Sequence, residues 1–280
     1  MSERAQRLNG VQNATVGSLA GMIEVLLQQP TVAMKNAIQQ GRPITWSVPV
    51  LYRGVGVSLV SIAPISAVQF AINGKLLAGD GAEPSDAAKI ACGAIAGCCS
   101  STLSSPAELV MTLQQNSGKS FMKTVSEVSA QCGVPRLFRG LEVTALRESV
   151  WCASYLALGP VLTHKLHGWS PKVFGDAQTA TMSQKATASA IGSILAGLVT
   201  VYGTQPLDTV KTVMQGEAQT VGKNARSSLS VARTLWQQGG LQAFYRGVVP
   251  RGARLVGAVF ILGQARNVLE EVFEGHALLQ

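Results

Sequence analysis

The residues best suited to chemistry are a few charged side chains in stretches of the sequence that are otherwise apolar. Arg147 and Glu148 are adjacent, Arg251 and Arg254 lie about one helical turn apart, and Glu24 stands alone. An ionisable side chain inside an apolar span is costly, so its presence indicates a binding or transport site. A guanidinium group can bind a carboxylate through two parallel hydrogen bonds, and a carboxylate beside it can accept from an ammonium group. These residues therefore predict binding of a small metabolite that carries a carboxylate, an ammonium group or both.

The composition favours a membrane protein. Of the 280 residues, 47% are hydrophobic and only 14% are charged, with a mean hydropathy of +0.25. A typical soluble domain has about 25% charged residues. A formal net charge of +8 is compatible with nucleic acid, an anionic membrane surface or anionic substrates as partners. The low charge density favours the membrane and predicts no nucleic-acid partner, and the composition excludes a disordered chain, a collagen and a coiled coil.

Stretches without Asp, Glu, Lys or Arg are candidates for membrane-spanning helices. They cover residues 8–23, 54–74, 90–107, 149–163, 186–207 and 255–265. A hydrocarbon core about 30 Å thick needs about 20 mostly apolar residues per helix, so the shorter stretches must include polar residues that face the protein interior. The chain opens Met1-Ser2-Glu3-Arg4 without the apolar core of a signal peptide, and we expect no cleavable presequence.

A three-fold repeat organises the chain. Pro30, Pro106 and Pro206 each follow a glycine by nine residues and precede a glutamine by nine residues. The glycines are Gly21, Gly97 and Gly197, and the glutamines are Gln39, Gln115 and Gln215. An aromatic-Arg-Gly triplet recurs at 52–54, 138–140 and 245–247, and each triplet opens another apolar stretch. Each repeat is thus two helices joined by a polar loop, with expected boundaries 1–84, 85–180 and 181–280, and each proline should kink its helix.

Equivalent positions of the repeats differ in a way that the scaffold itself does not require. Seven residues beyond each triplet glycine, about two helical turns, lie Ser61, Arg147 and Arg254. A small substrate is asymmetric, so differences at equivalent positions of a symmetric scaffold indicate where it binds. Ile62 and Glu148 adjoin the first two positions. Adjacent helical residues point about 100° apart, so we expect Arg147 and Glu148 not to neutralise one another.

The segment Pro206-Leu207-Asp208-Thr209-Val210-Lys211, together with the repeats, the glutamines and the triplets, resembles the signature of the mitochondrial carrier family. The resemblance covers essentially the whole chain. It implies an all-α protein with six transmembrane helices in three pseudo-symmetric pairs around a central substrate path, alternately open to either side of the inner mitochondrial membrane. In the family, the acid of one repeat pairs with the base of the next and closes the matrix side, and the three glutamines brace that gate.

The resemblance also assigns substrate contacts. It places Ser61, Arg147 and Arg254 at the three contact points of the family, with Ile62 and Glu148 adjoining. The Arg147-Glu148 pair resembles the pair found in carriers of amino acids and related zwitterions. Glu24 and Arg251 are further candidates for the cavity, and for all these charges pairing between helices purely for structure is the alternative.

Repeats one and two each lack one residue of the gate signature. Repeat one has Val32 in place of the acid, and repeat two has Met111 in place of the base. Carrying the family pairing over gives the contacts Val32 to Met111, Glu108 to Lys211, and Asp208 to Lys35. No retained charge is left without a partner, which matters because an unpaired buried charge costs several kcal/mol. Simple degeneration of the signature is the alternative, and it predicts unpaired charges.

The loops of the repeats differ in length. Residues 122–131 and 229–238 have the apolar spacing of helices that lie on a surface, and we expect both at the matrix side. The shorter loop of repeat one leaves no room for such a helix.

No pattern indicates an enzyme, a cofactor or a metal site. The five cysteines form no CxxC pair and are expected to be reduced and buried, and His164 and His167 lack further ligands and are expected in a solvated loop. We therefore predict a monomeric carrier of a small anionic or zwitterionic metabolite, amino-acid-like, with membrane lipid, including cardiolipin, as a further partner. The alternatives are a dicarboxylate, tricarboxylate or keto-acid carrier, and a carrier-like adaptor without transport.

Overall fold

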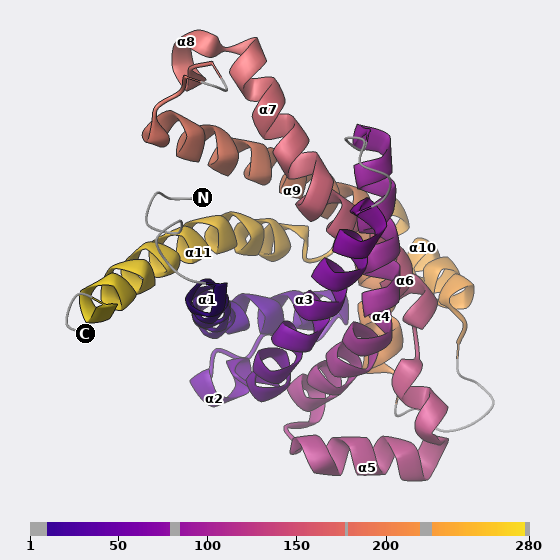
Figure 1. Cartoon of the computed structure of the whole chain (residues 1–280). Coiled ribbons are helices and arrows are strands. Elements are labelled where there is room, and N and C mark those ends of the chain that lie inside the picture. The colour runs from indigo at the N-terminus through magenta and orange to yellow at the C-terminus, as the bar shows by residue number, and fades with distance from the viewer. Residues whose placement is uncertain (1–9, 79–84, 177–178, 219–225, 278–280) are drawn as a thin grey trace.

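The computed structural model describes residues 10–78, 85–176, 179–218 and 226–277, and all elements within these ranges are helical (Figure 1). The longer helices are α1 (Gly10–Gln39), α3 (Val55–Leu77), α4 (Asp86–Ser117), α9 (Met182–Gly216) and α11 (Val248–Ala277). Between α4 and α9 lie α5 (Phe121–Cys132), the 3-10 turn η2 (Val134–Phe138), α6 (Leu141–Ala153), the π-helical turn η3 (Ser154–Leu158), α7 (Gly159–Trp169) and α8 (Pro171–Phe174). The remaining helices are α2 (Val48–Leu51) and α10 (Ser228–Phe244). The expected all-α fold class is confirmed.

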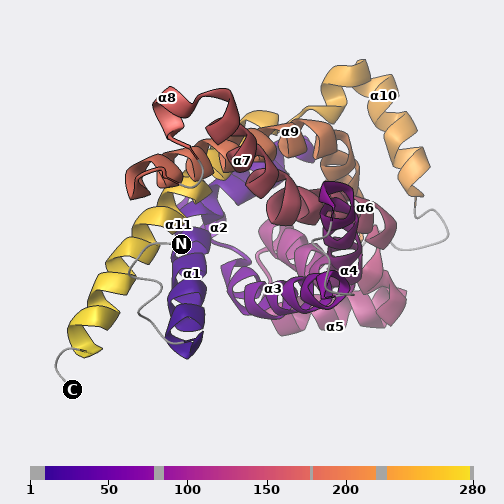
Figure 2. The ribbon, with the colours of Figure 1, turned by 45° about the horizontal axis from the view of Figure 1, so that its top comes forward.

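The helices pack in chain order into a closed ring. Helix α1 contacts α3, α3 contacts α4, and α4 contacts α6. Helices α6 and α7 contact α9, α9 contacts α11, and α11 returns to α1. Figures 1 and 2 both show α11 beside α1 and α7 beside α9. Because α9 also contacts α1 and α4, residues far apart in the sequence meet inside the ring.

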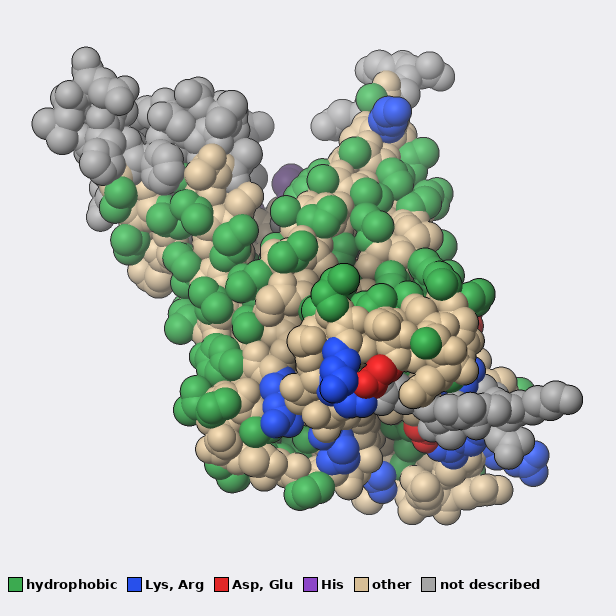
Figure 3. Space-filling view, turned by 90° about the horizontal axis from the view of Figure 1, so that it is seen from below, with side chains coloured by type: hydrophobic (Ala, Val, Ile, Leu, Met, Phe, Trp, Pro, Cys, Tyr) green, Lys and Arg blue, Asp and Glu red, His purple; other side chains and the backbone are tan. Residues whose placement is uncertain are grey.

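Polar side chains fill the interior of this ring, while apolar ones cover much of its surface. Gln205, Thr209 and Gln215 are fully buried, whereas Val60 and Val199 expose 78% and 64% of their surface. Figure 3 shows hydrophobic side chains over much of the visible face, with most Lys and Arg side chains in the lower half of the view. Exposed apolar surface on this scale is typical of contact with lipid. In the described part of the chain, Val48–Leu77 and Met182–Gly216 are long and apolar enough to cross a membrane.

The loops between the paired helices agree with the expected difference in length. Helix α5 covers the predicted segment 122–131, and α10 covers 229–238. Gly239 and Gly240 have non-helical backbone angles, so the regular part of α10 ends where predicted. The corresponding loop of repeat one holds only α2, which has four residues. The absence of room for a longer helix in repeat one is therefore confirmed.

The repeated prolines and glycines have distinct backbone roles. Pro30, Pro106 and Pro206 lie inside α1, α4 and α9, and each helix continues past its proline. The three triplet glycines come directly before α3, α6 and α11, with φ of +81°, +81° and +77° for Gly54, Gly140 and Gly247. Glycine is favoured at positive φ because it has no Cβ, so the triplet glycine sets the turn into each following helix.

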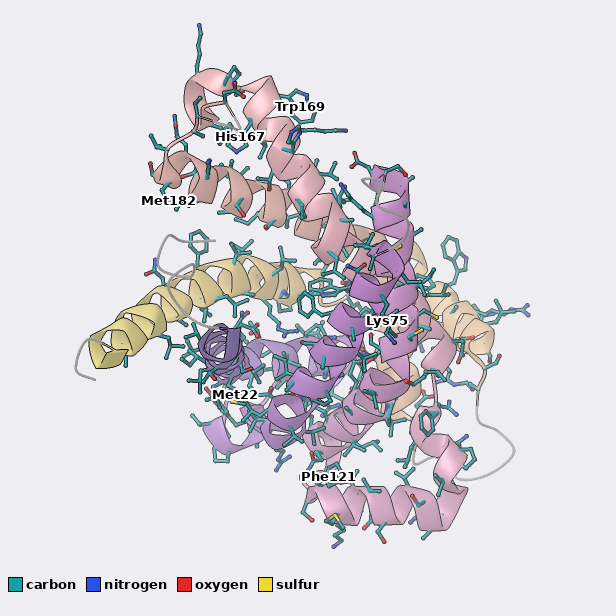
Figure 4. The ribbon with its side chains drawn as sticks, viewed as in Figure 1. Met22, Lys75, Phe121, His167, Trp169 and Met182 are labelled. Atoms are coloured by element: carbon teal, nitrogen blue, oxygen red, sulfur yellow. The ribbon has the colours of Figure 1, made fainter. Side chains whose placement is uncertain are left out.

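The expected burial of the cysteines and the expected exposure of the histidines were each wrong in part. Of the five cysteines, Cys152 is buried, but Cys98 and Cys99 are exposed on α4. An apolar stretch in lipid can have cysteine on its outer face, which the sequence does not distinguish from its inner face. His164 is exposed as expected, but His167 is buried and its Nδ1 lies 3.1 Å from the Gly175 carbonyl oxygen. Figure 4 shows His167 near the end of α7.

Candidate functional site

Arg147 lies in the middle of α6, where it is 9% exposed, and its guanidinium contacts carboxylates from three segments. Its Nη2 donates to Glu108 Oε1 at 2.7 Å and to Glu148 Oε1 at 2.5 Å. Its Nε is 3.7 Å from Asp208 Oδ1. The surroundings of a buried guanidinium must supply acceptors, because an unpaired buried charge is strongly unfavourable. Arg147 is therefore the centre of a charge cluster built from α4, α6 and α9.

The prediction that Arg147 and Glu148 do not neutralise one another is wrong. Backbone geometry points adjacent side chains apart, but both of these side chains are long enough to turn toward the same space inside the ring. Gln69 on α3 contacts the other Glu148 oxygen, with Nε2 3.5 Å from Oε2. The same amide donates to Ser100 Oγ on α4 at 3.1 Å. Glu148 is thus held between Arg147 and an amide from α3.

Both expected ion pairs between repeats are present. Lys35 Nζ on α1 lies 2.9 Å from Asp208 Oδ2 on α9, and Lys211 Nζ on α9 lies 2.7 Å from Glu108 Oε2 on α4. The Asp208 and Lys211 side chains are 2% and 5% exposed. These pairs tie α9 to both α1 and α4. The charges retained in the signature are therefore all paired, as the carry-over of the family scheme implied.

The third expected contact, between Val32 and Met111, remains a prediction. Met111 lies against the start of α3, where its Sδ accepts from Ser58 Oγ at 3.0 Å. A Cβ built on Gly54 would be 2.9 Å from Met111 Cγ. Met111 thus packs on α3, and Val32 on α1 is partly buried.

The repeated glutamines each bond to a different repeat. Gln39 Nε2 donates to Asp208 Oδ2 at 2.9 Å, and Gln215 Nε2 lies 3.4 Å from the Ser105 carbonyl oxygen. Gln115 Oε1 accepts from Asn36 Nδ2 at 2.6 Å. The three amides thus connect α1 to α9, α9 to α4, and α4 to α1. The bracing of a closed gate, which the resemblance implied for these glutamines, remains a prediction.

Arg254 and Glu24 form a second, looser site between α11 and α1. Arg254 Nη2 lies 3.6 Å from Glu24 Oε1, and the two side chains are 44% and 8% exposed. Gln28 Nε2 donates to the same Glu24 oxygen at 2.8 Å. Because the Arg254 side chain is 44% exposed and its contact with Glu24 is long, its guanidinium can donate to a further acceptor.

Arg251 already donates hydrogen bonds to acceptors on α9. Its Nη1 donates to the Val201 carbonyl and to Gln205 Oε1, both at 3.1 Å, and its Nη2 donates to Thr204 Oγ1 at 2.7 Å. Its Nε is 4.0 Å from Asp208 Oδ2. These contacts hold α11 against α9, which is the structural alternative that the sequence left open for Arg251.

Ser61 and Ile62 are the contact-point candidates of repeat one. Among the described residues, neither has a contact with Arg147 or Arg254. Ser61 Oγ donates to the Val57 carbonyl at 2.7 Å, within its own helix. It lines an apolar groove of about 740 Å³ between α3, α4 and α5. Ile62 Cδ1 lies 3.5 Å from a Cβ built on Gly21 of α1. In the contacts of the described residues, the charged candidates therefore form two separate pairs, Arg147 with Glu148 and Arg254 with Glu24, and the neutral candidates of repeat one join neither pair.

Three polar residues of the site were missed from the sequence. Gln69 contacts Glu148, Gln28 contacts Glu24, and Asn36 contacts Gln115. A signal existed for Gln69, since it is one of two amides in the charge-free stretch 54–74, with Asn73, and lies about two helical turns beyond Ser61. Gln28 and Asn36 lie in α1 near Pro30, where the sequence offers several amides and no rule to choose between them.

Comparison with known proteins identifies the family. A sequence model of the mitochondrial carrier protein matches residues 83–168 and 182–276. The tricarboxylate transporter FUM11 of Gibberella moniliformis is 31% identical over 291 residues, covering 95% of this chain and 89% of that protein. The mitochondrial citrate transporter A of Aspergillus niger is 27% identical, over 93% of this chain and 92% of its own length.

A relative whose name gives a different substrate is equally similar. The mitochondrial glycine transporter YMC1 of Saccharomyces cerevisiae is 27% identical, over 89% of this chain and 88% of its own length. These relatives align with this chain over most of their length at 27–31% identity, and their names give different substrates. The chain therefore belongs to the mitochondrial carrier family.

Proposed function

We propose that this chain is a transporter of a mitochondrial membrane that moves a small, amino-acid-like carboxylate by alternating access. In this proposal the helices form six spans in three repeats, 1–84, 85–180 and 181–280. The family assignment and the names of the relatives support a transporter rather than an enzyme, and a mitochondrial location. We propose the inner membrane as its location.

The proposed substrate class rests on one observation. Each of the two contact-point arginines, Arg147 and Arg254, lies beside a carboxylate. Arg147 is bonded to Glu148 at 2.5 Å, and Arg254 lies 3.6 Å from Glu24. An arginine binds the carboxylate of a zwitterion, and the glutamate beside it can then bind the ammonium group. A fully ionised tricarboxylate would instead need an excess of positive charge, and these two pairs have no net charge. Ser61 and Ile62 complete the proposed contact points on α3.

The ion pairs between α9 and its two neighbours support a gate on the matrix side. Lys35–Asp208 and Glu108–Lys211 would have to separate for the ring to open at that side, and the amides of Gln39, Gln115 and Gln215 would separate with them. Val32 and Met111 are proposed as the uncharged part of the same gate. Buried ion pairs stabilise the closed gate only when both partners are present. A buried charge that has lost its partner is strongly destabilising.

A di- or tricarboxylate or a keto acid is the second candidate substrate. The names of the tricarboxylate and citrate relatives favour it. It requires that Arg147, Arg251 and Arg254 act together and that Glu148 turns away from the ligand. The present bonds of Arg251 to Val201, Gln205 and Thr204 argue against its participation. A carrier-like adaptor without transport is a third candidate, and the retention of Arg147 and Arg254 at the contact points argues against it.

Membrane lipid, including cardiolipin, is proposed as a further partner of a monomeric carrier. The apolar groove of about 740 Å³ between α3, α4 and α5 has room for acyl chains. Its walls include Val57, Pro64, Leu103 and Val110.

The deciding experiment is uptake into proteoliposomes. Radiolabelled glycine, L-glutamate, citrate and 2-oxoglutarate are offered to the wild type and to Glu148→Gln. We expect uptake of an amino acid, lost in Glu148→Gln because the ammonium group no longer meets a charge. Glu142→Gln is the matched control, since Glu142 lies exposed in the first turn of the same helix. Uptake of citrate or 2-oxoglutarate alone, unaffected by Glu148→Gln, would favour the second candidate, and no uptake of any compound would favour the adaptor.

A further inference from the structure

One carboxylate joins the proposed gate to the proposed substrate site. Glu108 Oε2 accepts from Lys211 Nζ at 2.7 Å, and its other oxygen, Oε1, accepts from Arg147 Nη2 at 2.7 Å. The bond to Lys211 belongs to the pairing between repeats. The bond to Arg147 does not, and it comes from the residue that stands at the contact point of repeat two.

Arg147 uses one nitrogen, Nη2, for both of its hydrogen bonds to carboxylates. Nη2 donates to both Glu108 and Glu148, so both of its N–H groups are already in use. Nε, on the same edge of the group, is buried without a hydrogen-bond partner and lies 3.7 Å from Asp208 Oδ1. A carboxylate ligand binds a guanidinium best through two parallel hydrogen bonds from one edge. To bind through Nε and Nη2, it must take Nη2 away from Glu108 or Glu148.

We infer that Glu108 is a positioning residue of the substrate site that competes with the substrate carboxylate for Arg147. This inference rests on the proposed function, because it assumes that the substrate presents a carboxylate to Arg147. Glu108 holds Arg147 in the empty carrier, and the arriving carboxylate replaces it, which leaves Glu108 with Lys211 alone. The bond of Glu108 to Arg147 and the binding of the substrate carboxylate to Arg147 oppose one another, and such coupling is reciprocal. A change that weakens or strengthens the hold of Glu108 on Arg147 must therefore change the affinity for substrate.

Two variants of the same ion pair separate this inference from simple weakening of the gate. Glu108→Gln removes the competing charge, so Arg147 becomes freer to bind a carboxylate. Lys211→Met breaks the same contact between α4 and α9 but leaves Glu108 with Arg147 as its one cation. The two variants therefore have opposite effects on substrate affinity, although both remove the same gate contact.

The first measurement is the KM for whichever of glycine, L-glutamate, citrate or 2-oxoglutarate the wild type takes up. We expect Glu108→Gln to lower KM and Lys211→Met to raise it, each by about 5-fold or more. A shift of KM in the same direction for both variants, or no shift for either, would overturn the inference. If the methionine variant does not fold, as judged by its thermal unfolding, Lys211→Gln takes its place.

The second measurement needs no substrate. Phenylglyoxal modifies accessible arginine, and mass spectrometry of the purified protein in detergent gives the rate at Arg147. Glu108→Gln should raise this rate and Lys211→Met should not, with the rate at the exposed Arg233 as internal reference. If no compound of the panel is taken up but the rates separate in this way, the proposed substrate class fails while the hold of Glu108 on Arg147 is supported. Equal rates in the two variants would overturn that hold.

Discussion

The carbonyl oxygen of Glu148 on α6 lies where a side chain of Gly97 on α4 would begin. A Cβ built on Gly97 would overlap that oxygen, and one built on Gly93, a turn earlier, would be 2.9 Å from Ala153 Cα. The backbones of α4 and α6 are therefore in direct contact along this line, as small residues four apart allow. Gly97 was found in the sequence as part of the repeat, and in the structure it fixes the backbone position of a candidate site residue.

Replacing Gly97 should disturb both stability and the site. We expect Gly97→Ala to destabilise the protein by about 1–3 kcal/mol, because α4 and α6 must move apart to admit the methyl group. Gly56→Ala is the matched control, since Gly56 is a helical glycine with no atom within 4 Å of its built Cβ. The measurement is the shift in melting temperature in detergent, and equal shifts for both variants would show that the close approach of α4 and α6 is absent.

Substituting lysine at the two candidate arginines tests the binding geometry apart from charge. We expect Arg147→Lys and Arg254→Lys each to abolish most uptake, because an ammonium group cannot form two parallel bonds to a carboxylate. The melting temperature should change little for Arg254→Lys, whose side chain is 44% exposed.

Arg147→Ala should behave differently from Arg147→Lys. It leaves Glu108 and Glu148 without their shared cation and should cost about 3–5 kcal/mol of stability, as expected for breaking a buried pair. Arg233→Ala, at an exposed position of α10, serves as control for both experiments. Full uptake by either lysine variant would contradict the assignment of that residue to the substrate site.

Symmetry and signature residues allowed much of this arrangement to be predicted from the sequence. The surface helices α5 and α10, the short α2 and the ion pairs Lys35–Asp208 and Glu108–Lys211 all followed from spacing or from the family resemblance. These features depend on local periodicity or on a pairing rule that repeats around the ring.

What the sequence did not reveal depends on the reach of individual side chains. Arg147 bonds to Glu148 and Glu108 at once, although adjacent positions on a helix point apart. The π-helical turn η3 divides α6 from α7, where Gly159 donates its backbone N–H to the Ser154 carbonyl and Pro160 has no N–H to continue the pattern. The side-chain conformation of Arg147 and the π-helical turn both depend on packing in three dimensions. The sequence repeat does not predict that packing.

The pair Lys35–Asp208 should show strong coupling that resists salt. A double-mutant cycle with Lys35→Met and Asp208→Asn, read from melting in detergent, should give a coupling of about 0.5–3 kcal/mol. The side chains are 14% and 2% exposed, so added KCl should change this coupling little. The more accessible pair Lys119–Glu127 is the control, with side chains 36% and 24% exposed, and its cycle should give about 0–1 kcal/mol and decrease with salt. Additive effects of Lys35→Met and Asp208→Asn would exclude a coupled gate.

The uncharged part of the proposed gate can be tested by restoring the family residues. Val32→Glu alone or Met111→Lys alone adds a buried charge without a dedicated partner, so each should lower the melting temperature or the rate of uptake. Met111→Lys also removes the acceptor of Ser58 Oγ, which bonds to Met111 Sδ at 3.0 Å. Ser58→Ala is therefore included as a control for that loss.

The double variant decides whether positions 32 and 111 face each other. If they do, Val32→Glu should recover much of what Met111→Lys loses, with a coupling of about 0.5–3 kcal/mol that greatly exceeds any coupling between Val32→Glu and Ser58→Ala. The recovery should be greatest when the matrix side is closed, because the partners separate when that side opens. Strictly additive losses would mean that Met111 remains on α3, against Gly54 and Ser58, and that the edge between α1 and α4 closes through the Asn36–Gln115 bond without a contact at position 32.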